Sequence, residues 1–333
     1  MVDHINRFRK GPRMSALIKG FPEAVTITEV GPRDGLQSIA QWVPTEAKIE
    51  MVNGLLAAGL RQFEVTSFVA PRAVPQMRDA AEVLAGIDRS FGAELTALVP
   101  NAKGAERAVE AGVDAMVVFM SASESHNQAN VNCSRERSLE GFREIVRIAE
   151  AAGIEVKGAI ATAFGCPFEG NVPDSAVADL AKAYADMGIR RITLGDTTGM
   201  ATPPLVQSRC RTLAAEVPGS DVTLHFHNTR GVGLACVYAG LLEGTTRYES
   251  SVGGLGGCPF APGATGNICT EDLIYLLDEC GVQSGVDGEK VAEVARRMED
   301  LLGYPLPGQV MHAGPRLALK PRDAVRSSSG SAA

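Results

Sequence analysis

Two histidines separated by one residue give the clearest chemical signal in the sequence. His225 and His227 fall in a β-rich run, 222–227, where alternate side chains point to the same face. The chain contains only five His, and two on one face favour a shared metal ion over a pair buried for packing. Asp34 and Asn267 each follow a predicted strand and could add oxygen ligands, although Asp34 also suits a turn and Asn267 a helix N-cap. A mixed nitrogen and oxygen set predicts a divalent metal, Mg²⁺ or Mn²⁺, with Zn²⁺ or Co²⁺ as alternatives.

Two further residue types could act on a carbonyl compound near such a metal. Arg33, beside Asp34, is a fixed cation that could stabilise an enolate oxygen, or it could form an ion pair with Glu29 or Glu64. Cys258 lies in the glycine-rich segment 252–267, which could close over a substrate and present the thiol for proton exchange. The predicted chemistry is therefore metal-assisted carbanion or enolate chemistry.

The elements that must position these residues alternate regularly along the chain. Short β-rich runs are predicted at 24–30, 61–66, 94–99, 115–120, 155–161, 191–194, 222–227 and 247–251. Amphipathic helical runs are predicted between them at 45–58, 74–85, 102–111, 139–152, 175–187, 204–216 and 234–242, and a further helix at 288–302. Glycines such as Gly112 and Gly188 stand where these helices should end.

Eight such units predict an α/β fold, a (β/α)₈ TIM barrel, and no GxGxxG follows the first strand as a Rossmann fold would require. We expect an N-terminal tail at 1–22, one catalytic barrel at 23–305 with an extra C-terminal helix capping it, and a mostly flexible tail at 306–333. The catalytic residues of such barrels lie at the carboxyl ends of the strands. The residues singled out above fall at that end.

Composition limits the partners and the compartment. The net charge of −7 over 333 residues gives no reason to expect nucleic acid binding, and no apolar run is long enough to span a membrane. Seven Cys without a CxxC pair argue against a disulfide framework and for a reducing compartment. The basic first twenty residues contain only one serine, Ser15, whereas a transit peptide is rich in serine, so we expect a cytoplasmic, bacterial-type enzyme rather than a mitochondrial one.

Taken together, several segments resemble the 3-hydroxy-3-methylglutaryl-CoA lyase family, within a superfamily of metal-dependent lyases and condensing enzymes. The resemblance spans about 25–302. It rests on EVGPRDGLQ (29–37), EVTSFVAPRAVPQM (64–77), Asn132-Cys133-Ser134, GCPFEG (165–170), LGDTTG (194–199) and GLGGCPFAPGATGN (254–267). The last motif is close to a signature of the lyases, and the synthases lack its Cys loop.

The resemblance implies cleavage of a branched 3-hydroxyacyl-CoA to acetyl-CoA and a keto acid, as in leucine degradation, by a homo-oligomer of two or more subunits. It also implies roles for individual residues. The implied metal ligands are Asp34, His225, His227 and Asn267. Arg33 would polarise the thioester carbonyl and Cys258 would transfer a proton, while Glu29, Gln37, Glu64 and Asp196 would orient other groups or handle protons. Asp196, or a residue around His225, is the candidate base for the substrate hydroxyl.

One departure from the family pattern bears on the substrate. The family typically reads HxHDTYG, whereas this chain reads HFHNTRG, with Asn228 and Arg230. A guanidinium near the metal would suit a more anionic acid portion, so Arg230 is a candidate substrate-binding residue. A citramalyl-CoA lyase is therefore an alternative, as is an enzyme that condenses an acyl-CoA with a keto acid. A zinc hydrolase and an inactive barrel scaffold fit the motifs less well.

Overall fold

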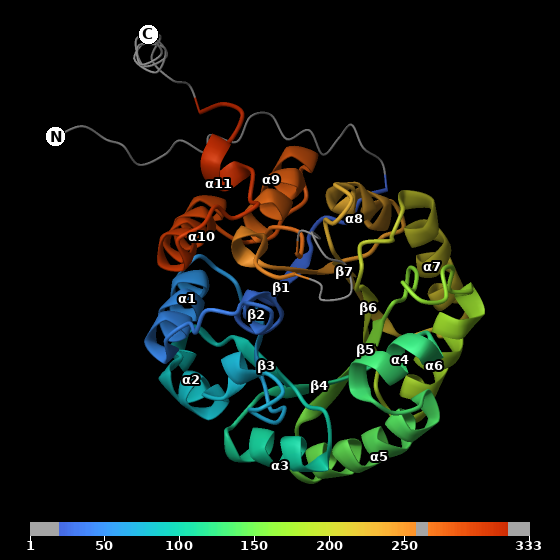
Figure 1. Cartoon of the computed structure of the whole chain (residues 1–333). Helices are drawn as coiled ribbons and strands as arrows, with labels where there is room; N and C mark the ends of the chain where they lie inside the picture. Colours follow the sequence, from blue (N-terminus) through green and yellow to red (C-terminus); the bar gives the residue numbers. More distant parts are fainter. Residues whose placement is uncertain (1–19, 258–265, 319–333) are drawn as a thin grey trace, which may run out of the picture.

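The computed structural model describes residues 20–257 and 266–318, and eight parallel strands close into one barrel in the order β1 to β8. Figure 1 looks down this barrel, with the helices forming a ring around it. The strands are β1 (Thr26–Glu29), β2 (Gln62–Ser67), β3 (Glu94–Leu98), β4 (Ala115–Ser121), β5 (Glu155–Ala161), β6 (Arg191–Asp196), β7 (Asp221–Phe226) and β8 (Arg247–Ser250). The barrel closes where β1 pairs with β8, with Thr26 opposite Arg247 and Glu29 opposite Ser250. The predicted TIM barrel is confirmed.

The helices follow the strands as expected for a (β/α)₈ fold. They are α1 (Thr45–Ala57), α2 (Ala80–Gly86), α3 (Ala102–Glu110), α4 (Glu124–Val131), α5 (Arg135–Ala151), α6 (Asp174–Asp186), α7 (Pro203–Glu216), α8 (Gly233–Leu242), α9 (Thr270–Cys280), α10 (Gly288–Leu302) and α11 (Val310–Ala313). Gly112 and Gly188 follow α3 and α6 with φ of 71° and 83°, the left-handed conformation that glycine adopts without strain. None of the described helices is long and apolar enough to cross a membrane.

The C-terminal part of the barrel differs from the sequence prediction. The eighth unit has its own helix, α9, which the sequence analysis missed. The predicted extra helix is α10, and it packs beside α1 and α9 in the outer ring rather than across one end of the barrel (Figure 1). After it, the backbone amide of Val310 at the start of α11 donates to Asp272 of α9 at 2.7 Å. Residues 306–318 thus contact the barrel, whereas 1–19 and 319–333 lie outside the described residues.

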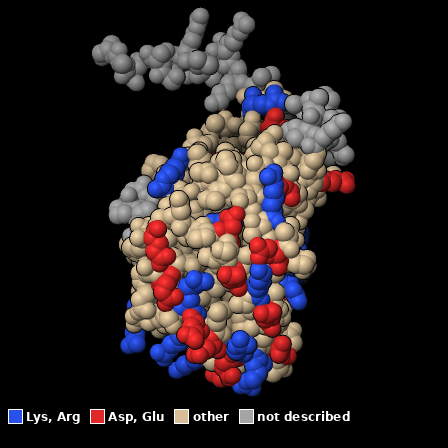
Figure 2. Space-filling view, turned by 90° about the vertical axis from the view of Figure 1, so that its right-hand side faces the viewer, with Lys and Arg blue, Asp and Glu red and all other residues tan. Residues whose placement is uncertain are grey.

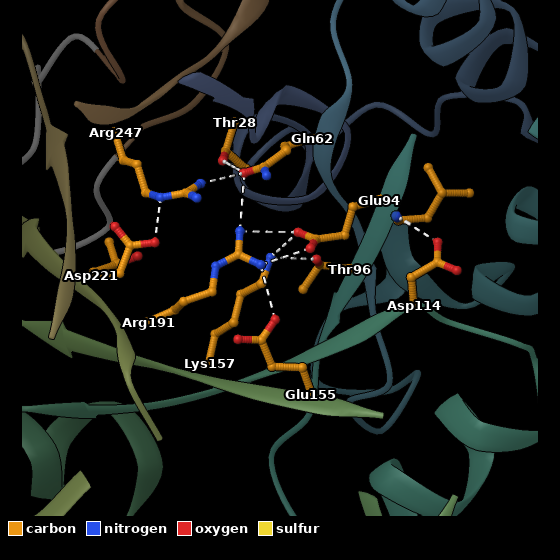
Figure 3. Close-up of polar contacts among 12 residues, drawn as sticks. Thr28, Gln62, Glu94, Thr96, Asp114, Glu155, Lys157, Arg191, Asp221 and Arg247 are labelled. Atoms are coloured by element: carbon orange, nitrogen blue, oxygen red, sulfur yellow. Dashed lines mark hydrogen bonds and ion pairs between the residues drawn. The ribbon is translucent and has the colours of Figure 1, made fainter. Parts of the chain in front are cut away.

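The amino end of the barrel interior is filled by charged side chains that pair with one another (Figure 3). Arg191, the first residue of β6, donates to Glu94 at 2.7 Å, to Glu155 at 3.0 Å and to Gln62 at 3.1 Å. Lys157 also forms an ion pair with Glu94. Paired charges can be buried where isolated ones cannot. This network closes the floor of the barrel beneath the cavity at the other end.

Positive and negative side chains are interspersed on the face of the molecule shown in Figure 2. Ion pairs also join neighbouring helices of the outer ring. Lys182 of α6 pairs with Glu216 of α7 at 2.5 Å, and Arg211 of α7 pairs with Glu243, just after α8, at 2.6 Å. Exposed pairs of this kind add little stability.

Candidate active site

The loop after β1 forms a single wide helical turn, Gly31–Gly35, that carries Arg33 and Asp34. The buried Glu29 carboxylate holds the start of this turn, because it accepts hydrogen bonds from the backbone amides of Gly31 and Val252, each at 2.8 Å. A Cβ at Gly31 would lie 2.6 Å from a Glu29 oxygen, so the close approach requires glycine. Glu29 therefore joins the first and last βα loops and fixes the turn on which the chemistry depends.

Asp34 lies beside the two histidines of the seventh strand. Its Oδ2 atom is 4.0 Å from Nε2 of His225 and 3.9 Å from Nε2 of His227, and the two imidazole centres are 5.2 Å apart. The three possible ligand atoms all lie within 4.8 Å of one another. Two ligands each about 2.1 Å from one cation can be up to about 4.2 Å apart, so the Asp34–His separations fit a shared ion.

Asn267 completes this cluster from the loop after β8. It forms an isolated antiparallel bridge with His227, and its Nδ2 donates to Asp34 Oδ2 at 2.9 Å and to the Leu255 carbonyl at 3.2 Å. Its Oδ1 is buried and has no partner among the described residues. A buried oxygen without a donor is unfavourable unless a ligand satisfies it. Asn267 is not a helix N-cap, because α9 begins after Cys269.

The pKa values of Asp34 and His227 are both shifted by their surroundings. Burial alone would raise the pKa of Asp34, but the Arg33 cation and the two imidazoles hold it below its usual range. Burial and the neighbouring His225 lower the pKa of His227 to about 4. At neutral pH the cluster therefore presents an anionic carboxylate and a neutral imidazole, the protonation states in which both groups bind a metal.

Glu249, on β8, was not singled out from the sequence. Its Oε2 lies 2.9 Å from Nδ1 of His225, and its Oε1 accepts a hydrogen bond from the Thr193 hydroxyl at 2.8 Å. A carboxylate on one imidazole nitrogen orients the ring and leaves the other nitrogen for a ligand. The alternation of side chains along β8 places Glu249 on the inner face of the barrel, and this alternation could have identified it as a candidate site residue from the sequence.

Arg33 is held by two acids on the rim of the site. Its Nε pairs with Glu64 on β2, and its Nη1 lies 2.7 Å from Asp34 Oδ1. Gln37 donates to the same Asp34 oxygen at 2.8 Å. Burial would lower the pKa of Arg33, but the charges of Glu64 and Asp34 raise it, so the guanidinium stays a fixed cation. Of the two ion pairs considered from the sequence, the one with Glu64 forms, and Glu29 instead binds backbone amides and the Thr270 hydroxyl.

A cavity of about 1480 Å³ lies at the carboxyl end of the barrel. The described lining includes Arg33, Asp34, Gln37, Glu64, His225, His227 and Glu249. On the opposite side, the strands β3 to β5 contribute apolar side chains such as Val117 and Phe119, and the segments after β3 and β4 add polar ones, including Asn101, Arg137 and Glu144. Such a concave site with a few convergent polar groups is typical of an enzyme active site.

The structure does not bring every predicted residue to this cavity. Asp196 lies behind the wall, where Oδ1 accepts from the amides of Met200 and Ala201 at 2.7 and 3.0 Å, and burial raises its pKa to about 6. Arg230 is exposed and donates to the carbonyls of Thr198 and Gly199, at 2.9 and 2.6 Å. Neither side chain lines the cavity.

Asn228 and Cys258 were also singled out from the sequence. Asn228, which replaces the typical Asp after the second His, accepts a hydrogen bond from the Gly233 amide at 3.1 Å and so contacts the start of α8. Cys258 lies outside the described residues. Its predicted role in proton transfer therefore remains a prediction.

Comparison with known proteins identifies the family of this chain. The model of the HMGL-like family matches residues 24–298. A Bacillus subtilis hydroxymethylglutaryl-CoA lyase is 44% identical over 87% of this chain and 97% of its own length. A 3-hydroxy-3-isohexenylglutaryl-CoA/hydroxymethylglutaryl-CoA lyase of Pseudomonas aeruginosa is 44% identical over 85% of this chain and 94% of its own. A solved HMG-CoA lyase from Acinetobacter baumannii, in complex with coenzyme A and 3-methylmalate, superposes with a TM-score of 0.86 at 43% identity, covering 91% of this chain and 99% of that one.

Proposed function

This chain belongs to the HMGL-like family, and on that premise we propose that it is a carbon–carbon lyase acting on 3-hydroxy-3-methylglutaryl-CoA or a related branched 3-hydroxyacyl-CoA. The reaction breaks the bond between C2 and C3, releasing acetyl-CoA and a keto acid. The observation that carries the proposal is the cluster of Asp34, His225 and His227 beside the Arg33 guanidinium in one cavity.

We propose that Asp34, His225, His227 and Asn267 hold one divalent cation, Mg²⁺ or Mn²⁺. The support is the short separation of the three ligand atoms and the buried, unpartnered Oδ1 of Asn267. Bound there, the cation supplies a Lewis acid that lowers the pKa of the substrate hydroxyl. Nitrogen and oxygen ligands without a thiolate suit these metals.

Arg33 is the proposed group for the thioester. Glu64 and Asp34 engage its Nε and Nη1, which fixes the plane of the guanidinium and leaves Nη2 for a substrate oxygen. When the C2–C3 bond breaks, negative charge develops on the thioester oxygen, and a cation already held in place stabilises it without reorganisation. Gln37 supports this arrangement by binding the same Asp34 oxygen as Arg33.

Two proton transfers balance the reaction. The substrate hydroxyl loses a proton, and C2 of the departing enolate gains one. Asp196 was the candidate base from the sequence, but Glu64 lines the cavity whereas Asp196 does not, so we assign the first transfer to Glu64. Cys258 remains the proposed donor to C2, and the role of Asp196 becomes positioning of the loop after β6.

The alternatives are less well supported by the same geometry. The case for a citramalyl-CoA lyase rested on Arg230 lying near the metal, and its guanidinium instead binds carbonyls of the loop after β6. The case for a condensing enzyme rests on the shared barrel, whereas the relatives described above are named lyases. We further propose that the enzyme acts in the cytoplasm as a homo-oligomer.

The test is acetyl-CoA release, followed by chromatography, from hydroxymethylglutaryl-CoA and citramalyl-CoA with Mg²⁺ or Mn²⁺ and then with a chelator. We expect chelator-sensitive cleavage of hydroxymethylglutaryl-CoA. Cleavage of citramalyl-CoA alone would replace the proposed substrate. No cleavage of either compound with any metal, but condensation of acetyl-CoA with a keto acid, would replace the reaction.

A further inference from the structure

Residues 37–43, which we call the rim loop, follow the turn that carries Arg33 and Asp34. The first part of this loop, residues 37–41, lines the cavity beside those two side chains. The Ile39 amide donates to the Leu36 carbonyl at 3.0 Å, and from there to Val43 the backbone lies outside helices and strands. Such a segment keeps one position only where other groups satisfy its backbone amides and carbonyls.

One buried side chain supplies these partners. Gln76, in the short turn Pro75–Met77 after β2, is 4% exposed. Its Nε2 donates to the Ile39 carbonyl at 2.8 Å and to the Gln41 carbonyl. Its Oε1 accepts from the Val43 amide at 3.3 Å. A single amide group thus binds three alternate residues of the rim loop, much as a neighbouring strand would.

Gln76 is itself fixed by a buried ion pair. Its backbone carbonyl accepts a hydrogen bond from Lys48 Nζ at 2.5 Å, and Lys48 pairs with Asp79 at 2.7 Å. The Thr45 hydroxyl donates to the same Asp79 carboxylate at 2.8 Å. Buried charges that are paired and hydrogen-bonded hold their partners in defined positions. None of these four residues lines the cavity, so the cluster acts on the site only through the rim loop.

The rim loop contacts the proposed site at two points. Gln37 donates to Asp34 Oδ1 at 2.8 Å. Ser38 lies beside Gly257, where an added Cβ would be 3.5 Å from the Ser38 hydroxyl oxygen, and Gly257 lines the cavity as well. A displaced rim loop would therefore withdraw Gln37 from Asp34 and change the cavity wall at Ser38.

We infer that Gln76 is a positioning residue for the lyase reaction, acting through the rim loop and not by contact with the substrate. Its amide fixes the loop backbone, and the loop gives the wall beside Arg33 and Asp34 one shape for the acyl-CoA. The position requires a group that donates twice and accepts once, which a side-chain amide provides and a carboxylate does not. This inference rests on the proposed function.

Trp42 gives a readout of the rim loop that is independent of activity, because it is the only tryptophan of the chain. Its ring centre lies 4.0 Å from Lys48 Nζ and 3.7 Å from the Arg78 guanidinium carbon. Trp42 also precedes Val43, which Gln76 binds. When the loop is released, acrylamide should reach the indole more readily, and we expect the quenching constant to rise at least about twofold in Gln76→Leu.

The experiment compares Gln76→Leu with Thr45→Val, a control that removes a hydrogen bond from the same cluster and keeps the bonds to the rim loop. For acetyl-CoA release from hydroxymethylglutaryl-CoA by the Mn²⁺-loaded enzyme, we expect kcat/KM of Gln76→Leu to fall about 10- to 100-fold, with a raised KM. Thr45→Val should keep the wild-type KM and quenching constant. Mn²⁺ affinity should stay close to wild type in both variants, because Asp34 keeps its contacts with Arg33 and Asn267. General unfolding would instead lower kcat and the amount of bound Mn²⁺ and leave KM unchanged.

Gln76→Glu tests the hydrogen bonds in a side chain of the same length. Its carboxylate can accept from the Val43 amide but cannot donate to the two carbonyls, so KM and quenching should rise. Protonation restores one donor, so the ratio of variant to wild-type kcat/KM should be higher at pH 6 than at pH 8. Wild-type KM and quenching in both Gln76 variants would overturn the inference, and so would equal changes in Thr45→Val. Absence of cleavage by the wild type would refute the proposed function instead, and the quenching constants would still test the hold of Gln76 on the loop.

Discussion

Replacing Glu249 by Gln should weaken metal binding although Glu249 is not a proposed ligand. The carboxylate holds Nδ1 of His225 at 2.9 Å and is itself held by the Thr193 hydroxyl at 2.8 Å. Gln keeps the shape and can still accept one hydrogen bond, but it removes the charge. A hydrogen bond to a charged group is worth about 1.5–3 kcal/mol and a neutral one about 1 kcal/mol.

The difference, about 0.5–2 kcal/mol, corresponds to a loss of about 2- to 30-fold in metal affinity, since 1.4 kcal/mol is a factor of ten. This range overlaps the 10- to 100-fold that loss of a carboxylate behind a metal-bound histidine typically causes. Burial would lower the pKa of His225, and the hydrogen bond to Glu249 raises it. The imidazole of the variant should therefore also be a weaker base.

The assay is titration of the metal-free protein with Mn²⁺, followed by calorimetry and by the electron paramagnetic resonance signal of free Mn²⁺. The matched control is Glu155→Gln, which removes a carboxylate from the barrel floor that pairs with Arg191 and does not touch a histidine. Wild-type affinity in Glu249→Gln would refute the reasoning. So would an equal loss in both variants, since it would reflect general loosening of the barrel.

Four further outcomes are expected. Asp34→Ala should weaken Mn²⁺ binding more than about 100-fold by the same titration, and near-normal binding would remove Asp34 from the ligand set. Cys258→Ser should leave the KM for the CoA substrate close to wild type and lower kcat by about 10²–10⁴-fold, whereas loss of substrate binding would make the thiol structural. Burial raises the pKa of Glu29 from 4.5 to about 7, so the folded state holds a proton that the unfolded state has lost. The free energy of unfolding, measured with urea, should therefore fall between pH 4.5 and 7, by at most about 3 kcal/mol from this group. Glu29→Gln should flatten this part of the curve of stability against pH, and an unchanged slope would contradict the prediction. Asn228→Ala should lower the free energy of unfolding by about 1 kcal/mol, because it removes the hydrogen bond from the Gly233 amide. Asn228→Asp should restore or exceed the wild-type value, because its charge lies at the start of α8. Equal stability of all three proteins would show that this hydrogen bond contributes nothing.

The fold was predictable because its signals are local and repeated. Each β-rich run is followed by an amphipathic helix, and glycines such as Gly112 and Gly188 adopt the positive φ expected at a helix end. The helices that were missed lack such a pattern. In α9, the buried residues include Thr270, Glu271 and Asp272. Polar residues therefore occupy positions where an amphipathic helix is recognised by apolar ones.

The site was predictable only where strand geometry determines the outcome. Side chains alternate between the two faces of β7, so His225 and His227 lie on the same face independently of the conformation of the neighbouring loops. Glu249 also faces inward, but a single acid in a strand of four residues gives no indication of its partner, which is contributed by the neighbouring strand. Arg230 was expected near the metal because it is three residues from His227, yet the loop after β7 directs its guanidinium to the loop after β6. A short separation in sequence therefore predicts which side chains lie together within a strand, but it does not predict this across a turn.

Closure of the barrel between its first and last strands has a consequence for how the enzyme is made. Asp34 and Asn267 are separated by 233 positions in the chain, and β1 has no second neighbour until β8 has been synthesised. Pairings of such long sequence separation form slowly and late in folding. Translation must therefore pass Asn267 before the four proposed ligands can meet, so a nascent chain that lacks β8 has no preformed site for a cation. Metal loading is expected to follow folding, and the metal supply at that stage then decides which ion the enzyme carries.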